Sequence, residues 1–376
     1  MYFYISRSGT IQRIAIILTV IFISIQISFA SEEAEHTNNQ KEGFNAGEMI
    51  IEHIIDAHEW HIMTIGHTHV SVPLPIILYY DGKLDIFMSS KFHHGHKSYK
   101  GYKLVTEDIK TQSEEERKGD IVRVIPGTME TDYNAGLPLD LSITKNVAAI
   151  FISLLLICII FISVGKAYTK RKGQAPKGLQ SFMEPIILFI RDEVAKASIG
   201  EKRYEKFLPY LLTLFFFIIF NNLLGLVPFF PGGANLTGNI AVTGVMALFT
   251  FLIIIVKGNK QYWIHIFNTP GVPWWLKIPV PLMPVVEVLG MLTKPFVLMI
   301  RLFANITAGH IIVLGFMSLI FIFGNRSVAL GYGVSVLSVG FGIFIGLLEL
   351  LVAFIQAYVF TLLSALYFGM ATEESH

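Results

Sequence analysis

Two apolar stretches near the C-terminal end, residues 282–323 and 328–370, restrict the fold of this chain more than any other feature. Each holds about 42 residues, which as a helix would measure about 63 Å at 1.5 Å per residue. A perpendicular membrane crossing needs only about 20 residues. Each stretch therefore folds back on itself, or both form long helices that are steeply tilted or run in the membrane plane. Because residues 324–327 form the one clear break, we expect a long tilted hairpin with its tip outside.

The composition indicates an integral membrane protein. Hydrophobic residues make up 53% of the chain and charged residues only 15%, whereas a soluble domain carries roughly 25% charged residues. The net charge of +1 excludes a general polycationic nucleic-acid binder. A single cysteine, Cys158, excludes a disulfide framework and a cysteine-based metal cluster.

Three further stretches, residues 147–164, 207–227 and 240–256, are apolar and close to the length of a membrane span. Basic residues follow the first and the third stretch, and such residues mark the cytoplasmic side. Residues 179–200 mix apolar and charged side chains, which predicts an amphipathic helix along the membrane interface. The expected fold is therefore an all-α integral membrane protein with five transmembrane helices, the last two forming the hairpin, and one interfacial helix.

The N-terminal part predicts export. Residues 1–30 combine two arginines, a short apolar core and small residues at the end, which is typical of a cleavable signal peptide; an uncleaved anchor helix is the alternative. Residues 31–145 would then be a periplasmic segment, and residues 146–376 the membrane domain. We expect the cell inner membrane, a periplasmic mature N-terminus and a cytoplasmic C-terminus.

The exported segment is rich in histidine. It holds nine of the twelve histidines. Residues 48–63 predict an amphipathic helix, and residues 70–90 predict a β-hairpin around Asp81-Gly82. No histidine pair has the spacing of a closed metal site with acids or cysteines, so we expect a solvated surface and no bound metal, with metal binding or proton collection as the alternative. The nine histidines are His36, His53, His58, His61, His67, His69, His93, His94 and His96.

The hairpin carries ionisable side chains that the membrane penalises. Each costs about 2.5–3.5 kcal/mol or more inside a span, which makes each one a functional candidate. Arg301 is the hardest to accommodate, because it cannot lose its proton. The nearest acid, Glu287, lies about 21 Å away along the helix axis. Arg301 therefore needs a negative partner from outside this helix.

Helical geometry separates these side chains onto different faces. At 100° per residue, Glu287, Lys294, Arg301 and Asn305 fall within about 40–60° of one face, whereas His310 falls on the opposite face. On the last helix, Glu349 and Gln356 share a face. Titratable groups separated by a fixed cation suit a controlled proton path. The alternative is that His310, Glu349 and Gln356 merely bind one another across the hairpin.

Residues 301–310 read Arg-Leu-Phe-Ala-Asn-Ile-Thr-Ala-Gly-His, which resembles the signature of the a subunits of F-type ATP synthases. The run from Asn221 to Pro228, the interval from Glu287 to Arg301, and Lys294-Pro295 resemble the same family, as do residues 350–374. The resemblance covers about residues 146–376. Residues 31–145 have no role that it supplies.

The resemblance implies a stator that carries protons beside a rotating ring of c subunits, with no catalysis and no cofactor of its own. Arg301 would meet a carboxylate of the ring and keep two offset half-channels apart, because a nearby cation favours the ionised acid whereas lipid favours the neutral one. Other expected partners are the peripheral-stalk subunit b, the rest of the complex and membrane lipid. The resemblance assigns Asn305, His310, Glu349 and Gln356 to the outward half-channel and Glu287 to the cytoplasmic exit.

One departure and two other protein classes remain to be weighed. Many bacterial members have an acid at the position of His310 and a histidine at that of Glu349, so the two roles are exchangeable here. A proton-coupled secondary transporter is the alternative, although the chain lacks the internal repeat that many transporters show. A haem-binding electron carrier would need histidine pairs within spans, but His310 is the only histidine inside one.

Overall fold

The computed structural model describes residues 45–65, 68–106, 109–111, 114–116, 119–125, 127–227, 232–268 and 282–373. The chain separates into two units, Met1–Asn45 and Ala46–His376, and all but one of the described residues belong to the second. The signal peptide expected at residues 1–30 lies outside the described residues. So do Pro228 and Pro231, which the sequence predicts in an external turn, and Trp274 and Trp275, which it predicts in a cytoplasmic loop.

Residues 31–145, which the sequence predicts to be exported and which we call the exported segment, fold, where they are described, into one short α-helix and small antiparallel sheets. Strand β3 pairs with β4 and β9, β1 with β2, β5 with β8, and β6 with β7. The predicted β-hairpin is confirmed for β3 and β4, which are joined by Asp81 and Gly82 at φ +48° and +76°, the positive values that a tight hairpin turn requires. The elements are α2 (Ala46–Ile54), β1 (Glu59–Ile65), β2 (Thr68–Pro73), β3 (Pro75–Tyr80), β4 (Lys83–Met88), η1 (Ser89–Phe92), β5 (Tyr102–Leu104), β6 (Ile109–Thr111), β7 (Glu114–Glu116), β8 (Ile121–Arg123) and β9 (Leu139–Asp140).

The helix predicted over residues 48–63 is wrong in its second half. Helix α2 ends at Ile54, and strand β1 begins at Glu59 and pairs with β2. Between them, Asp56 accepts the backbone N–H of Ala57 at 3.0 Å, a local bond that competes with continuation of the helix. The start of the predicted hairpin is also wrong, because residues 70–73 belong to β2.

The exported segment is fastened to the start of the first membrane helix. Asp56 accepts the hydroxyl of Thr144 at 2.7 Å and the backbone N–H of Asn146 at 3.0 Å. His58 bonds to Asp140 at 2.7 Å. Burial alone would raise the pKa of Asp140, but the bonds from His58 and Ser142 outweigh it and hold that pKa below its usual value. Both sides of this junction are therefore joined by directed, partly buried polar contacts.

The five predicted membrane spans are confirmed. Among the described residues, five helices are long and apolar enough to cross a membrane, by length and composition. They are α3 (Lys145–Lys170), α6 (Leu208–Leu226), α7 (Ile240–Lys257), α9 (Leu282–Arg326) and α10 (Val328–Thr372).

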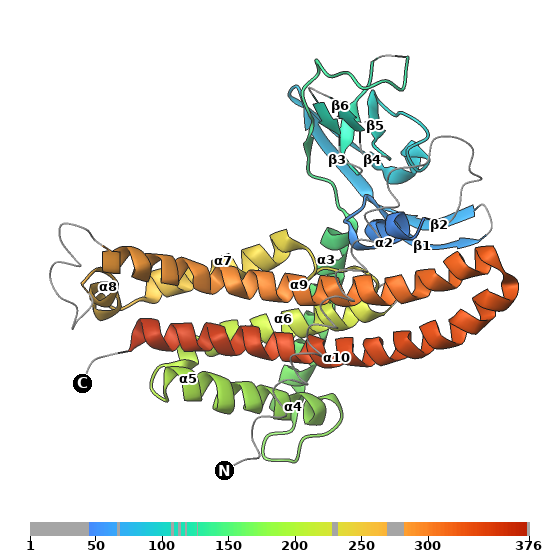
Figure 1. Cartoon of the computed structure of the whole chain (residues 1–376). Helices are drawn as coiled ribbons and strands as arrows, with labels where there is room; N and C mark the ends of the chain where they lie inside the picture. The colour runs from blue at the N-terminus through green and yellow to red at the C-terminus, as the bar shows by residue number, and fades with distance from the viewer. Residues whose placement is uncertain are drawn as a thin grey trace, which may run out of the picture. The chain divides into compact units, whose positions relative to one another are not determined.

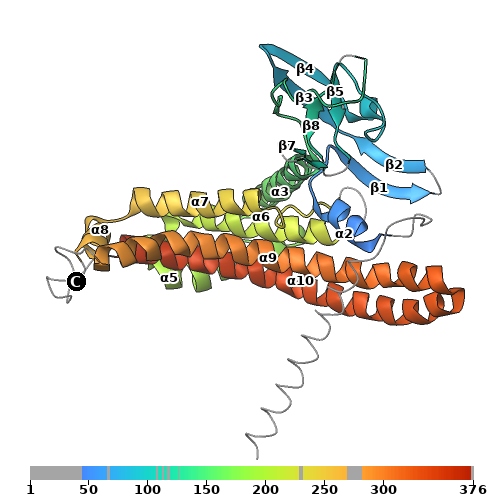
Figure 2. The ribbon, with the colours of Figure 1, turned by 45° about the horizontal axis from the view of Figure 1, so that its top comes forward.

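Helices α9 and α10 form the predicted hairpin and lie side by side (Figures 1 and 2). The connection is shorter than the four residues expected, because α9 runs to Arg326 and only Ser327 separates it from α10. Small residues permit the close approach near the tip, where a Cβ atom on Gly331 would lie 2.8 Å from the Cα of Gly324. The two helices of the hairpin therefore pack closely against each other near its tip.

The opposite end of the hairpin is held by the rest of the membrane domain. The rings of Phe207 and Phe368 stack with centroids 5.0 Å apart. The backbone N–H of Asn259 donates to the carbonyl of Ala371 at 2.8 Å, and its side-chain amide donates to Thr372 at 2.8 Å. The end of α10 is thus bonded to the link between α7 and helix α8 (Lys260–Phe267).

The stretch predicted as an amphipathic helix is helical but irregular. It comprises α4 (Leu179–Phe189), a π-helical segment η2 (Ile190–Lys196) and α5 (Ala197–Ile199), and a short helix η3 (Tyr204–Lys206) follows. Within η2, hydrogen bonds from Arg191 and then Lys196 hold the pKa of Asp192 well below its usual range. The π-helical turn was not expected. The sequence also predicts Trp263 in the cytoplasmic loop that follows residues 240–256, but Trp263 lies on helix α8.

Candidate functional site

One face of α9 presents Arg301 to the outside of the protein. Its side chain is exposed, as are Ala304, Asn305 and Ala308, whereas Leu302 is buried. Within the part of the chain that the structure describes, Arg301 forms no ion pair and no hydrogen bond. The cation lies among small residues that leave room for another helix.

The predicted face of α9, which we call the stripe, holds Glu287, Lys294, Arg301 and Asn305, and other helices partly cover it toward the start of α9. The ammonium of Lys294 lies 5.4 Å from the ring centroid of Tyr367 on α10, and the charge of Arg301 also acts on Tyr367. Glu287 is half-buried and lies near Tyr262 of α8. Burial, and after it the negative charge of Glu287, raises the pKa of Tyr262. The four residues of the predicted stripe therefore divide into a covered pair and an exposed pair.

The opposite face of α9 places His310 against α6. A Cβ atom on Gly225 would lie 3.7 Å from the Nε2 atom of His310. The carboxylate of Glu349 lies against Gly309, so closely that a Cβ atom there would overlap with it. Glu349 of α10 thus contacts α9 at Gly309, the residue directly before His310. The prediction that His310 and Arg301 lie on different faces agrees with this arrangement.

The structure does not support the alternative in which His310, Glu349 and Gln356 merely bind one another across the hairpin. No hydrogen bond joins these three described side chains. Gln356 is buried on α10, three residues beyond Ala353. Each of the three therefore keeps hydrogen-bonding capacity that a proton or water can use.

A group of buried polar residues continues from His310 along α6. The side-chain amide of Asn222 donates to the carbonyl of Ala353 at 3.2 Å, and its oxygen accepts the hydroxyl of Thr237 at 2.6 Å. The Nδ2 atom of Asn235 is buried without a partner. Thr307 donates to the carbonyl of Gly238 at 3.4 Å. This polar interior lies between apolar helices on the same side as His310.

Sequence reasoning missed Asn235, Thr237 and Thr307. It noted Asn222 only as part of a resemblance. The available signal was a polar run, Asn235 to Asn239, directly before an apolar span. Nothing in that run indicates that it folds back against α6 and α9, because the contact depends on the tertiary arrangement.

The exported segment reaches the same region. Helix α2 packs against α9, and the charges of His53 and Lys145 both act on His310. Lys145 is buried and its ammonium donates to the carbonyl of His53 at 3.2 Å. A cation of the first membrane helix and a histidine of the exported helix therefore lie beside the histidine face of α9.

The described residues hold no group of three or more His, Cys, Asp and Glu side chains that could bind a metal ion. Most of the exported histidines that the structure describes are spread over separate elements. His58 instead bonds to Asp140, and His94 pairs with Glu59 at 2.9 Å. These two histidines form contacts within the exported fold.

In comparisons with known proteins, two family models match separate parts of the chain. A family model described as "ATP synthase A chain" matches residues 147–369. A second model, described as a domain of unknown function, matches residues 49–132.

Curated proteins with similar sequences carry matching names. ATP synthase subunit a of Chloroherpeton thalassium is 45% identical over 245 residues, which cover 63% of this chain and 69% of that protein. ATP synthase subunit a 2 of Chlorobaculum tepidum is 48% identical over 242 residues, covering 63% and 65%. ATP synthase subunit a of Anaeromyxobacter sp. is 43% identical over 242 residues, covering 61% and 54%.

Proposed function

Because the chain belongs to the ATP synthase A chain family, we propose that it moves protons past a rotating ring of c subunits through two offset half-channels. The protein translocates protons in the membrane sector of the F-type ATP synthase complex and is itself non-catalytic. This membership decides against the secondary transporter. We further propose that its partners are the c-ring and the peripheral-stalk subunit b. The protein would lie in the cell inner membrane, with a periplasmic mature N-terminus and a cytoplasmic C-terminus.

The observation that carries the proposal is the side chain of Arg301, which is exposed, lies in the middle of an apolar helix of 45 residues and forms no ion pair with the described residues. An isolated charge at this depth costs several kcal/mol, which a carboxylate on a neighbouring helix would offset. The exposed Ala304 and Ala308 allow that helix to approach. A ring carboxylate would release its proton when it reaches Arg301, because the cation favours the ionised form.

The buried polar residues on the other face support an outward half-channel. His310, Glu349 and Gln356 would pass protons inward, with Asn305 at the transition to the ring-facing surface. Asn222 and Thr237 line the same side. The contact between α2 and α9 beside His310 supports an outer opening next to the exported segment. Residues 31–145 would thus be a periplasmic segment attached at the mouth, following a cleaved signal at residues 1–30.

Glu287 supports the cytoplasmic exit. It lies on the same helix as Arg301, near Tyr262 of α8, toward the end where α10 finishes. Lys257 and Lys260 flank this end, and basic residues mark the cytoplasmic side. A proton released near Arg301 would leave along this part of the stripe.

The decisive experiment is ATP-driven acidification of inverted membrane vesicles that contain the assembled complex with Arg301→Ala. We expect pumping to fall below detection while ATP synthase assembly is retained, because the exposed side chain makes no contact within the described chain. Arg326→Ala is the matched control, since Arg326 is also exposed and ends the same helix.

Pumping by the Arg326→Ala complex should equal that of the unmodified complex. Undiminished pumping by Arg301→Ala would refute the mechanism and leave Arg301 as a residue of assembly. Equal loss in both variants would attribute the effect to charge on α9 in general.

A further inference from the structure

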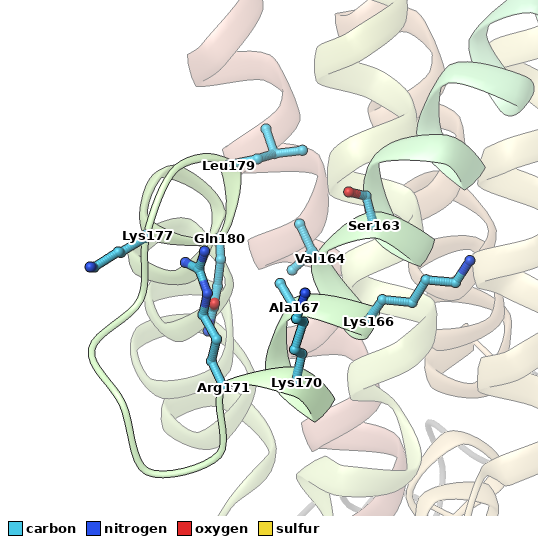
Figure 3. A pocket seen from close by; sticks show the side chains of 9 residues that line it. All are labelled: Ser163, Val164, Lys166, Ala167, Lys170, Arg171, Lys177, Leu179 and Gln180. Carbon is cyan, nitrogen blue, oxygen red and sulfur yellow. The ribbon is translucent and has the colours of Figure 1, made fainter.

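A cavity lies between the end of α3 and the start of α4, on the side that the proposed orientation makes cytoplasmic. Its volume is about 290 Å³. Figure 3 shows the lining side chains: Ser163, Val164, Lys166, Ala167, Lys170, Arg171, Lys177, Leu179 and Gln180. None of them belongs to the proton path proposed above, so the cavity needs a separate explanation.

The cavity is lined by four cations and no acid. Lys166, Lys170, Arg171 and Lys177 form no ion pair within the described part of the chain. In the view of Figure 3, Arg171 is drawn over Gln180 and Lys170 rises beside Ala167, whereas Lys166 and Lys177 extend away to opposite sides. Like charges that line one cavity repel one another, and an anion bound between them would offset that repulsion. Lys170 and Arg171 are the pair best placed to bind one.

Gln180 adds a second requirement. It is only 4% exposed, and although its side chain also bonds to Tyr168, its buried Oε1 atom has no hydrogen-bond partner among the described residues. An unsatisfied buried acceptor costs about 1–3 kcal/mol, which a donor in the cavity would recover. A bare phosphate diester offers no donor, whereas a hydroxyl-bearing headgroup does. The bound group should therefore combine negative charge with a hydroxyl.

The cavity also has an apolar side. Val164, Ala167 and Leu179 line it, and Ile159 and Ile162 are exposed on α3 just before it. This apolar surface leads from the cavity along a membrane helix. An acyl chain could follow it while the headgroup stays among the cations.

We propose that this cavity binds the headgroup of an acidic phospholipid with a free hydroxyl, of the phosphatidylglycerol type. Lys170 and Arg171 contact the phosphate, and Gln180 accepts a hydrogen bond from the hydroxyl. Leu179 and Val164 contact the start of the acyl chain. The same phosphate chemistry could come from a soluble phosphate compound, but the apolar wall favours the lipid.

The test measures phosphatidylglycerol bound to the purified, assembled complex by native mass spectrometry, after lipid exchange in detergent. The first comparison substitutes two neighbouring cations in turn. Arg171 lines the cavity, whereas the exposed Lys172 does not and serves as the control. Loss of one cation near a lipid surface corresponds to about fivefold weaker binding, and loss of two to about 30-fold. We expect fivefold weakening for Arg171→Gln, 30-fold for Lys170→Gln with Arg171→Gln, and less than twofold for Lys172→Gln.

A further comparison tests Gln180. Gln180→Leu should remove the preference for phosphatidylglycerol over phosphatidic acid, which lacks the glycerol hydroxyl, while both lipids still bind. Equal weakening by Lys172→Gln and Arg171→Gln would overturn the cavity as a specific site. Displacement of the lipid by millimolar inorganic phosphate would overturn the lipid assignment in favour of a soluble anion.

Discussion

The two faces of α9 differ in whether their polar side chains are exposed or covered by other helices. On the ring-facing side of the proposal, Arg301 and Asn305 are exposed and bordered by alanines. On the other side, His310 is covered by α6, and Asn222 and Thr237 are hydrogen-bonded in the interior. The buried face draws its stability from this chain, whereas the exposed face has polar groups that only another molecule can complete. Substitutions on the two faces should therefore differ in kind.

The largest loss of stability should follow Asn222→Leu. The buried hydroxyl of Thr237 would lose its acceptor, and an unsatisfied buried polar group costs about 1–3 kcal/mol. Denaturant unfolding of the purified subunit in mixed micelles, followed by circular dichroism, measures the change. The same substitution on the exposed face, Asn305→Leu, is the control and should change the free energy of unfolding by less than about 0.5 kcal/mol. Equal effects would remove the distinction between the faces.

A smaller loss should follow Asp56→Ala, which loosens the exported helix from the histidine face. Thr144 and the backbone of Asn146 lose their acceptor, at about 1 kcal/mol because the site is only partly buried. Limited proteolysis of the exported segment in the intact complex would report the loosening. Asp85→Ala removes a carboxylate that bonds to Lys100 and Tyr102 elsewhere in the segment, and it should leave cleavage near residue 56 unchanged.

Gly309→Ala should separate stability from function. The added Cβ atom would overlap with the Glu349 carboxylate, which moves away cheaply because it ends a flexible side chain. The free energy of unfolding should change by less than about 1 kcal/mol. The rate of proton pumping should nevertheless fall on the order of tenfold, because a small displacement of a reacting group slows the reaction strongly. Gly315→Ala, where no atom lies within 4 Å, should pump normally. Normal pumping by Gly309→Ala would argue against a role for the position of Glu349.

The smallest effect on stability should follow Arg301→Leu. In the isolated subunit the free energy of unfolding should stay within about 0.5 kcal/mol of the original, because the side chain has no partner in the described chain. In the assembled complex the same variant should not pump. A destabilised isolated subunit would show that Arg301 supports the fold of its own chain.

Much of the membrane domain could be predicted from residue type and spacing. The five spans, the hairpin of α9 and α10, and the separation of Arg301 from His310 follow from apolar length and from 100° per residue. The functional roles of the site residues remain predictions. The helix over residues 48–63 was predicted too long because apolar spacing alone outweighed the local bond of Asp56 to Ala57 and the pairing of β1 with β2. The polar residues Asn235 and Thr237 could not be assigned, because their contacts join segments that the sequence keeps apart.

The hydrogen bonds of Asn259 to the end of α10 have a mechanical consequence. The hairpin resembles a beam that is clamped at one end, whereas near Ser327 its two arms pack against each other. Arg301 lies near the middle of α9. If a ring turns beside it as proposed, a sideways load at Arg301 would act nearer to the clamp than the tip is and would bend the hairpin less than the same load at the tip.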